Sequence, residues 1–227
     1  MVSTKFLRRT AVAVAVGCAL GASSASAQTA FGSATTIVFP LTSNTATFTS
    51  TVTIYNPNPA DVTVGLSYFD ANDTLTPGAQ PCVDVLLPAN GSVEFTVPSK
   101  CTLDPNGGHF GQLIVSDVAG TNPIFGYVRT QNNANVGFSV EGFPSDNFAT
   151  DTTNSTGLKG NSTDPSVAYQ SNCFVAAQAD PISYTVRLFD GAGAQIGTDL
   201  TGSLNAFEEK RYVNIFNKVP SVPAATD

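Results

Sequence analysis

The residues best suited to form a covalent link are Cys82 and Cys101. They flank a segment turned by Asn90-Gly91, a dipeptide typical of tight β-hairpins. Folding this hairpin brings the two thiols together, and in an oxidising compartment they pair. The sequence therefore predicts a Cys82–Cys101 disulfide that closes a loop of about 20 residues and contributes about 3 kcal/mol. Cys173 is left over, either as a buried strand thiol, which its apolar neighbours favour, or as a reactive or intermolecular one.

His109 is the single histidine of the chain. Any Ser-His-Asp or Cys-His arrangement, and any imidazole metal site, must therefore use it. It follows Gly107-Gly108, in a segment that we predict to be an exposed loop entering a strand. The GxSxG, HExxH and phosphate-loop patterns are absent from the sequence. We therefore predict a protein that is not an enzyme and has no cofactor.

Oxygen ligands for calcium are a weak candidate at Asp70, Asn72 and Asp73. Their spacing resembles the start of a calcium loop, but the glycine and the distal bidentate Glu of that loop are missing. A plain polar turn explains the same residues. The later Asp190-Gly191-Ala192-Gly193 segment lacks the extra oxygens, which weakens the calcium interpretation further.

Carboxylate pairs and tyrosines offer two further kinds of chemistry. Asp180 with Asp190, or Glu208 with Glu209, could serve as a glycosidase acid and base if they converged on a cleft. We instead interpret the segment from Glu208 to Arg211 as a solvated turn. Tyrosines in strands usually pack in or beside the core, although some could stack on sugars. The six are Tyr55, Tyr68, Tyr127, Tyr169, Tyr184 and Tyr212.

The first 27 residues have the organisation of a signal peptide. Three basic residues precede a short apolar run, and Ala25-Ser26-Ala27 is a suitable cleavage site. The run is too short for a stable membrane anchor, which needs about 20 residues, and no later segment is apolar enough to cross a membrane. Two alternatives stay open: a twin-arginine signal at Arg8-Arg9 and a lipoprotein signal ending at Cys18. The sequence predicts a secreted, periplasmic or cell-surface protein.

The charge balance restricts the partners. Residues 1–27 hold three of the ten basic residues and none of the seventeen acidic ones, so the remainder has a net charge of −10. Nucleic acids and anionic membranes attract clustered Lys and Arg, and this chain does not supply them. A protein partner, self-association or a polysaccharide is compatible with such a surface.

Two-residue alternation, cut by Pro, Asn and Gly, dominates the chain after residue 28. Short strands with turn signals between them predict an all-β protein, and we favour an immunoglobulin-like β-sandwich. The chain has no Trp, so Phe residues must fill the core. The expected strands cover residues 35–40, 48–55, 62–70, 83–87, 93–97, 112–116, 124–130, 136–141, 171–175, 182–190, 200–204 and 211–216.

The domain organisation follows from composition and an internal repeat. We predict a sandwich domain over 28–142, a polar linker or long loop over 143–166, and a second, partial sandwich unit over 167–227. The repeat aligns 182–190 (ISYTVRLFD) with 62–70 (VTVGLSYFD) at an offset of 120 residues. The second copy is short, and three explanations stay open: a truncated chain, strands that complete the first sandwich, or completion by a strand from another molecule.

These features favour a non-enzymatic structural, adhesive or assembly module that acts through strand edges and loops. The alternative is an extracellular carbohydrate-binding module. A hydrolase that uses carboxylates or calcium is a third hypothesis.

Overall fold

The structure is a computed structural model that describes residues 32–71, 78–103, 108–148, 152–155, 158 and 171–222. The predicted signal peptide over 1–27 and the calcium candidates Asn72 and Asp73 lie outside these residues. In the described part of the chain, no helix has the length and hydrophobicity needed to cross a bilayer.

The described chain is built from β-strands and three short 3₁₀ turns, as predicted. The elements are β1 (Thr36–Asn44), β2 (Phe48–Tyr55), β3 (Val62–Asp70), β4 (Ala79–Gln80), β5 (Val85–Leu87), β6 (Ser92–Thr96), η1 (Val97–Ser99), β7 (His109–Asp117), β8 (Phe125–Asn132), β9 (Gly137–Glu141), β10 (Phe143–Pro144), η2 (Ser145–Asn147), β11 (Cys173–Ala176), β12 (Ile182–Phe189), β13 (Gln195–Leu204), β14 (Glu209–Tyr212) and η3 (Ile215–Asn217).

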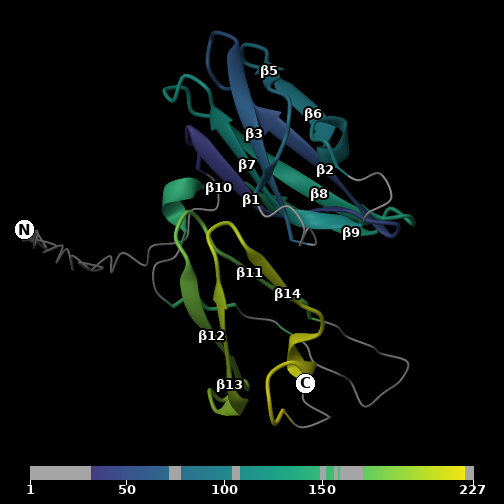
Figure 1. Ribbon diagram of the computed structural model, residues 1–227, viewed down its shortest axis with the longest axis vertical. Helices are drawn as coiled ribbons and strands as arrows, with labels where there is room; N and C mark the ends of the chain where they lie inside the picture. Colours follow the sequence, from purple (N-terminus) through teal and green to yellow (C-terminus); the bar gives the residue numbers. More distant parts are fainter. Residues whose placement is uncertain are drawn as a thin grey trace, which may run out of the picture.

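Strands β1 to β10 form a β-sandwich in the upper part of Figure 1. One layer contains β4 and β5 beside β3, then β7, β1 and β10, all antiparallel. The other layer contains β6, β2, β8 and β9. The two layers are joined through β1 and β2, which share a single pair, Asn44 with Thr49, at their hairpin. The predicted β-sandwich is therefore confirmed.

The core lies between these layers because each strand turns alternate side chains inward. Val52, Ile54 and Val128 from one layer meet Leu113 and Val115 from the other in a single buried cluster. Fully buried Phe39 and nearly buried Phe95 contribute to it, as expected for a core without Trp. Eight of the ten strands, all except β4 and β10, thus contribute side chains to one hydrophobic interior.

Two turns connect the layers instead of closing hairpins, which corrects the expected pairing. The strands on either side of Asn90-Gly91 pair with different neighbours, β5 with β3 and β6 with β2. The same holds for β2 and β3, which flank the Asn56-to-Pro59 turn. Asn56, fully buried, ties the two turns together: its Nδ2 donates to the carbonyls of Ala60 (2.8 Å), Leu87 (3.3 Å) and Pro88 (3.1 Å).

The immunoglobulin-like subtype remains a prediction. In an immunoglobulin constant-type domain, the last strand pairs with strand F and the first strand belongs to the B sheet. Here the first strand, β1, pairs mainly with β7, whereas the second strand, β2, pairs with β8 in the other layer. This differs from the constant-type arrangement, in which the first two strands belong to the same sheet.

The predicted linker starts with ordered structure. Phe143–Pro144 pairs with β1, and the η2 turn follows it. Residues 143–147 therefore lie against β1 of the sandwich.

The C-terminal strands form two separate ladders, β11 with β14 and β12 with β13. This repeats the sandwich, where β2 pairs with β6 and β3 with β5. A 3₁₀ turn follows the last strand in both sets, η1 after β6 and η3 after β14. Their small core contains Leu188, Ile215, Phe216 and Val219. The described strands of this unit pair with none of the sandwich strands.

Candidate functional site

The C-terminal ladders pack against the sandwich along a contact that we call the seam, formed by Phe69, Phe110, Gln112, Phe207, Glu209 and Arg211. Gln112 lies in β7 with its side chain fully buried. Its Nε2 donates to the carbonyls of Ala177 (3.0 Å) and Phe207 (3.2 Å). Its Oε1 accepts from Gln178 Nε2 (2.8 Å). The side-chain amide of Gln112 thus forms hydrogen bonds both with the turn before β14 and with the segment that follows β11.

Aromatic contacts complete the seam. The rings of Phe69 and Phe207 stack with centroids 4.4 Å apart, and the Arg211 guanidinium lies 4.5 Å from the Phe110 centroid. Phe207 has φ 61°, in the left-handed region that is costly for a bulky residue. Asn90 has φ 50° in the equivalent turn before β6. The backbone cost at Phe207 is tolerated where its ring covers Phe69.

His109 is not the exposed loop residue that the sequence predicts. It begins β7, is 7% exposed, and forms an ion-pair contact through Nδ1 with Asp70 Oδ2 at the end of β3. The strands β3 and β7 pair in register there, Asp70 beside Gly111, and this brings the two side chains together. The contact is a buried Asp–His pair where β3 ends and β7 begins.

Glu209 corrects the predicted solvated turn from Glu208 to Arg211. These residues enter β14, and Glu209 is 5% exposed, whereas Glu208 is exposed. Neither carboxylate oxygen of Glu209 has a hydrogen-bond partner. Burial raises the pKa of Glu209 to about 8, although nearby Arg211 lowers it. Glu209 is therefore largely protonated at neutral pH.

The calcium candidates are described only at Asp70, which contacts His109, because Asn72 and Asp73 lie outside the described residues. The side chain of Asp190 accepts hydrogen bonds from the amides of Ala192 (2.9 Å) and Ala194 (2.8 Å), as a plain turn does. Over the described ranges, no three His, Cys, Asp or Glu side chains are grouped so that they could hold a metal.

The tyrosines divide between core and surface. Tyr68 is 1% exposed, and the hydroxyls of Tyr184 and Tyr212 bond each other beside the small C-terminal core. Tyr127 is 44% exposed on the outer face of β8, two residues from Phe125, which contacts Tyr55 with ring centroids 4.8 Å apart. Phe125 and Tyr127 are exposed and Tyr55 is half-buried, and the three rings form a row on the outer layer of the sandwich.

The cysteines lie as predicted. Cys82 and Cys101 form the disulfide, and their backbones also pair with each other in an isolated antiparallel β-bridge. Cys173 lies in β11, half-buried against the C-terminal core, and burial raises the pKa of its thiol. Its place in a strand agrees with the prediction, whereas the thiol is half-buried and not fully buried.

The C-terminal unit has open strand edges. In the sandwich, β3 is flanked by β5 and β7, and β2 by β6 and β8. Their counterparts β12 and β11 each pair along one edge in the described chain, with β13 and β14. Phe189 in β12, at the offset of 120 residues from Phe69, is 57% exposed.

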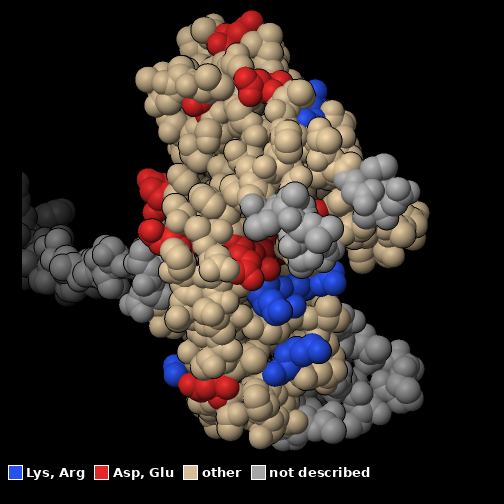
Figure 2. All heavy atoms as spheres, in the orientation of Figure 1, with Lys and Arg blue, Asp and Glu red and all other residues tan. Residues whose placement is uncertain are grey.

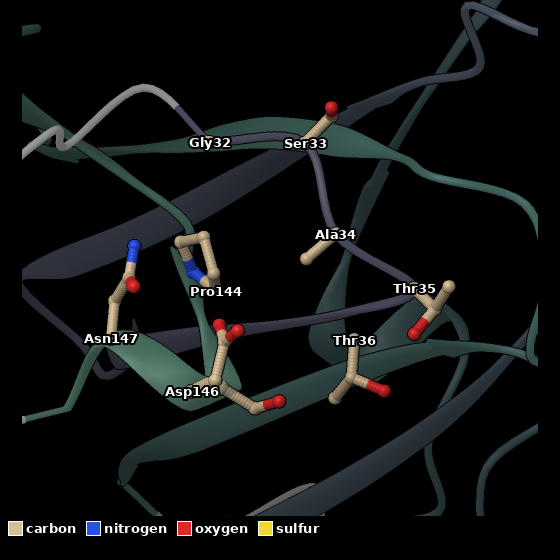
Figure 3. Close-up of a pocket in the computed structure, with 9 residues that line it drawn as sticks. Gly32, Ser33, Ala34, Thr35, Thr36, Pro144, Asp146 and Asn147 are labelled. Carbon is tan, nitrogen blue, oxygen red and sulfur yellow. The ribbon is translucent and has the colours of Figure 1, made fainter.

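Charge and surface shape differ between the two parts. Figure 2 shows most Lys and Arg atoms over the C-terminal strands, where Arg187, Lys210, Arg211 and Lys218 lie. Figure 3 shows an open pocket of about 410 Å³ between residues 32–36 and 144–147. Asp146 is its one charged lining residue, so it lacks the convergent groups of a typical ligand site.

Sequence reasoning missed Gln112 and Glu209, the two buried polar side chains of the seam. One signal was present: β7 has Phe110 and Ile114 on the face opposite Leu113 and Val115. A strand with large apolar residues on both faces indicates burial on both sides. That signal predicts a covering element without identifying it.

Comparison with known proteins identifies no family for this chain. No family model matches the chain, and no curated protein matches it. The crystal structure of Thermotoga maritima 1070 is similar over 51% of this chain and 97% of that chain, with 10% sequence identity and a TM-score of 0.39.

Proposed function

We propose that this protein is an exported, non-enzymatic assembly module that accepts an extended segment of a protein partner or of a second copy at the open edge of β12. The signal-peptide pattern and the Cys82–Cys101 disulfide support its export. The observation that carries the proposal is the repeated pairing pattern, in which β12 has β13 in the place of β5 but no described strand in the place of β7.

The exposed residue Phe189 supports the same location. Its counterpart Phe69 is covered by Phe207 across the seam, whereas Phe189 is exposed in β12. An added strand, with the chain that follows it, would shield this ring. Strand addition to an open edge gains main-chain hydrogen bonds along the strand, and alternate side chains supply specificity.

The backbone of β12 identifies a substitution that tests the edge. The amide of Asp190 donates to Ala194 O, so residues 182, 184, 186 and 188 face β13 and the residues between them face outward. Thr185→Pro removes an outward amide and leaves the β13 ladder bonds in place. Thr185→Val is the matched control, because it keeps the amide and a branched side chain.

The experiment compares assembly of the exported protein and its variants. We expect wild type and Thr185→Val to form oligomers, or to capture an alternating apolar peptide, in analytical ultracentrifugation, and Thr185→Pro to lose this association. A wild-type protein that stays monomeric and binds no extended peptide would contradict the proposal. So would full association by Thr185→Pro.

A second candidate, polysaccharide binding, is favoured by the exposed aromatic row. Phe125 and Tyr127 share one face of β8, and the paired strands place Thr53 and Glu141 beside Tyr127. Aromatic faces stack on sugar rings, and the neighbouring polar groups can bond their hydroxyls. Retention of the protein on insoluble or soluble glycans, lost on Tyr127→Ala and Phe125→Ala and kept in Thr185→Pro, would favour this candidate over assembly.

A further inference from the structure

Glu209 lies between two packed surfaces, with both carboxylate oxygens buried. Its register partner in β11 is Ala176, and two residues along β14 is Arg211, which covers Phe110 of the sandwich. Because side chains alternate along a strand, Glu209 points to the same side as Arg211, toward the sandwich. Burial is the main cause that raises the pKa of Tyr68, a core residue of β3, and an ionised Glu209 adds to it, so the two side chains lie within electrostatic reach. Glu209 thus faces the seam rather than the small C-terminal core.

The groups around Glu209 do not compensate a buried charge. From β14, Arg211 is the cation of the seam, and its guanidinium lies over the Phe110 ring. From β3 comes the Tyr68 hydroxyl, which lies within electrostatic reach of Glu209. Asp70 of β3 and His109 of β7, the other titratable groups at this end of the two strands, contact each other. Neither oxygen of Glu209 accepts a hydrogen bond from any of them. An ionised carboxylate buried without such bonds is strongly destabilising, so the closed seam favours the protonated form.

We propose that the seam is a pH-sensitive latch, closed while Glu209 is protonated and loosened when Glu209 ionises. Loosening separates the C-terminal ladders from the sandwich, because the Gln112 hydrogen bonds and the Phe69–Phe207 stack lie beside Glu209 in the same contact. The sandwich core contains no part of this contact and stays intact. This inference does not depend on the proposed assembly function.

The direction of the pH dependence follows from the linkage between proton binding at Glu209 and closure of the seam. Closing the seam raises the pKa of Glu209 from its ordinary value of 4.5 to about 8. Below the lower value both states are protonated, and the closed seam has its full stability. As the pH rises toward about 8, the open state releases its proton first, so opening becomes easier by about tenfold per pH unit. Above that value, both states are ionised and the dependence levels off.

Hydrogen exchange of the full exported protein tests the latch. The probe is a peptide covering 207–212, because residues 109–113 of β7 stay paired with β1 and β3 when the seam opens. Its protection factors are corrected for the intrinsic dependence of exchange on pH. Peptides of β2 and β8 report global unfolding. We expect wild-type protection of the seam to fall by about tenfold per unit between about pH 5 and 8, while β2 and β8 stay protected.

Two variants separate Glu209 from its neighbours. Glu209→Gln removes the ionisation and should flatten the profile, whereas Glu208→Gln makes the same change on the exposed neighbour and should keep the wild-type slope. If Glu209→Gln keeps the slope, another group such as His109 titrates and the proposal fails. If Glu209→Gln does not fold, the wild-type profile decides: protection of the seam that is independent of pH overturns the latch.

Discussion

The sandwich and the C-terminal unit contain the same four-strand pattern in different surroundings. In the sandwich, β2, β3, β5 and β6 are supplemented by further strands that enclose one core. In the C-terminal unit, β11 to β14 remain as two ladders over four buried residues. Two-stranded ladders are marginal in water without further strands or a covering surface. The four-strand pattern therefore needs further strands or a covering surface. In the C-terminal unit, the seam with the sandwich supplies that surface.

The largest contrast is expected from truncating a leucine in each core. Leu113→Ala removes a fully buried side chain of the sandwich and should lower the free energy of unfolding by about 3 kcal/mol. Leu188→Ala, in the C-terminal core, should leave the main thermal transition unchanged and increase the protease sensitivity of residues 171–222. Calorimetry and limited proteolysis measure both. Equal losses in the main transition would show that the two regions unfold as one.

Reduction of the disulfide affects only the sandwich. Breaking the Cys82–Cys101 bond should lower the stability of the sandwich by about 3 kcal/mol, because the unfolded chain regains the freedom of the closed loop. Denaturant titrations of a Cys82→Ala/Cys101→Ala variant measure the loss. Cys173→Ala is the control and should leave this transition in place. A loss of C-terminal protection without a change in the sandwich would contradict the assignment.

The layer-crossing turns predict a smaller loss at Asn56. Asn56→Ala leaves the carbonyls of Ala60, Leu87 and Pro88 without its amide donor, and should cost about 2 kcal/mol. Asn133→Ala removes an exposed bond to Ala46 and serves as the control, with no measurable change expected. The midpoint of urea unfolding measures both variants. Equal midpoints would show that Asn56 does not hold the turns together.

The smallest effect is expected at the seam, where equivalent phenylalanines can be compared. Phe69→Ala removes the stack with Phe207 and should weaken docking of the C-terminal strands by about 1 kcal/mol. Phe189→Ala, the exposed counterpart, should leave docking unchanged. Hydrogen exchange of residues 207–212 measures docking. A larger effect from Phe189 would place the stabilising contact elsewhere.

Strand positions could be predicted from the sequence because a strand with one buried face has apolar residues at every second position. The segment 182–190 was expected as a strand and β12 spans Ile182–Phe189, with Ile182, Tyr184, Val186 and Leu188 on one face. Partner strands could not be predicted, since Asn90-Gly91 specifies a tight reversal but not which layer the next strand joins.

The seam could not be predicted for a different physical reason. Gln112 contacts residues 65 to 96 positions away along the chain, so its burial depends on an element that the local pattern does not identify. Gly107-Gly108 before His109 indicates a loop, yet β7 begins at His109, whose backbone pairs with Asn44 of β1 and whose side chain contacts Asp70 of β3. Glu209 was placed in a solvated turn because four charged residues in succession are usually exposed.

The most direct test of the account is to produce the two regions separately. We predict that residues 28–148 fold into a monomer with a cooperative thermal transition, and that residues 171–222 alone show none. Adding the sandwich fragment should restore protection in the C-terminal strands. A fragment 171–222 that folds cooperatively as an isolated monomer would show that its open edges need no partner, and would contradict both the dependence on the seam and the proposed strand addition.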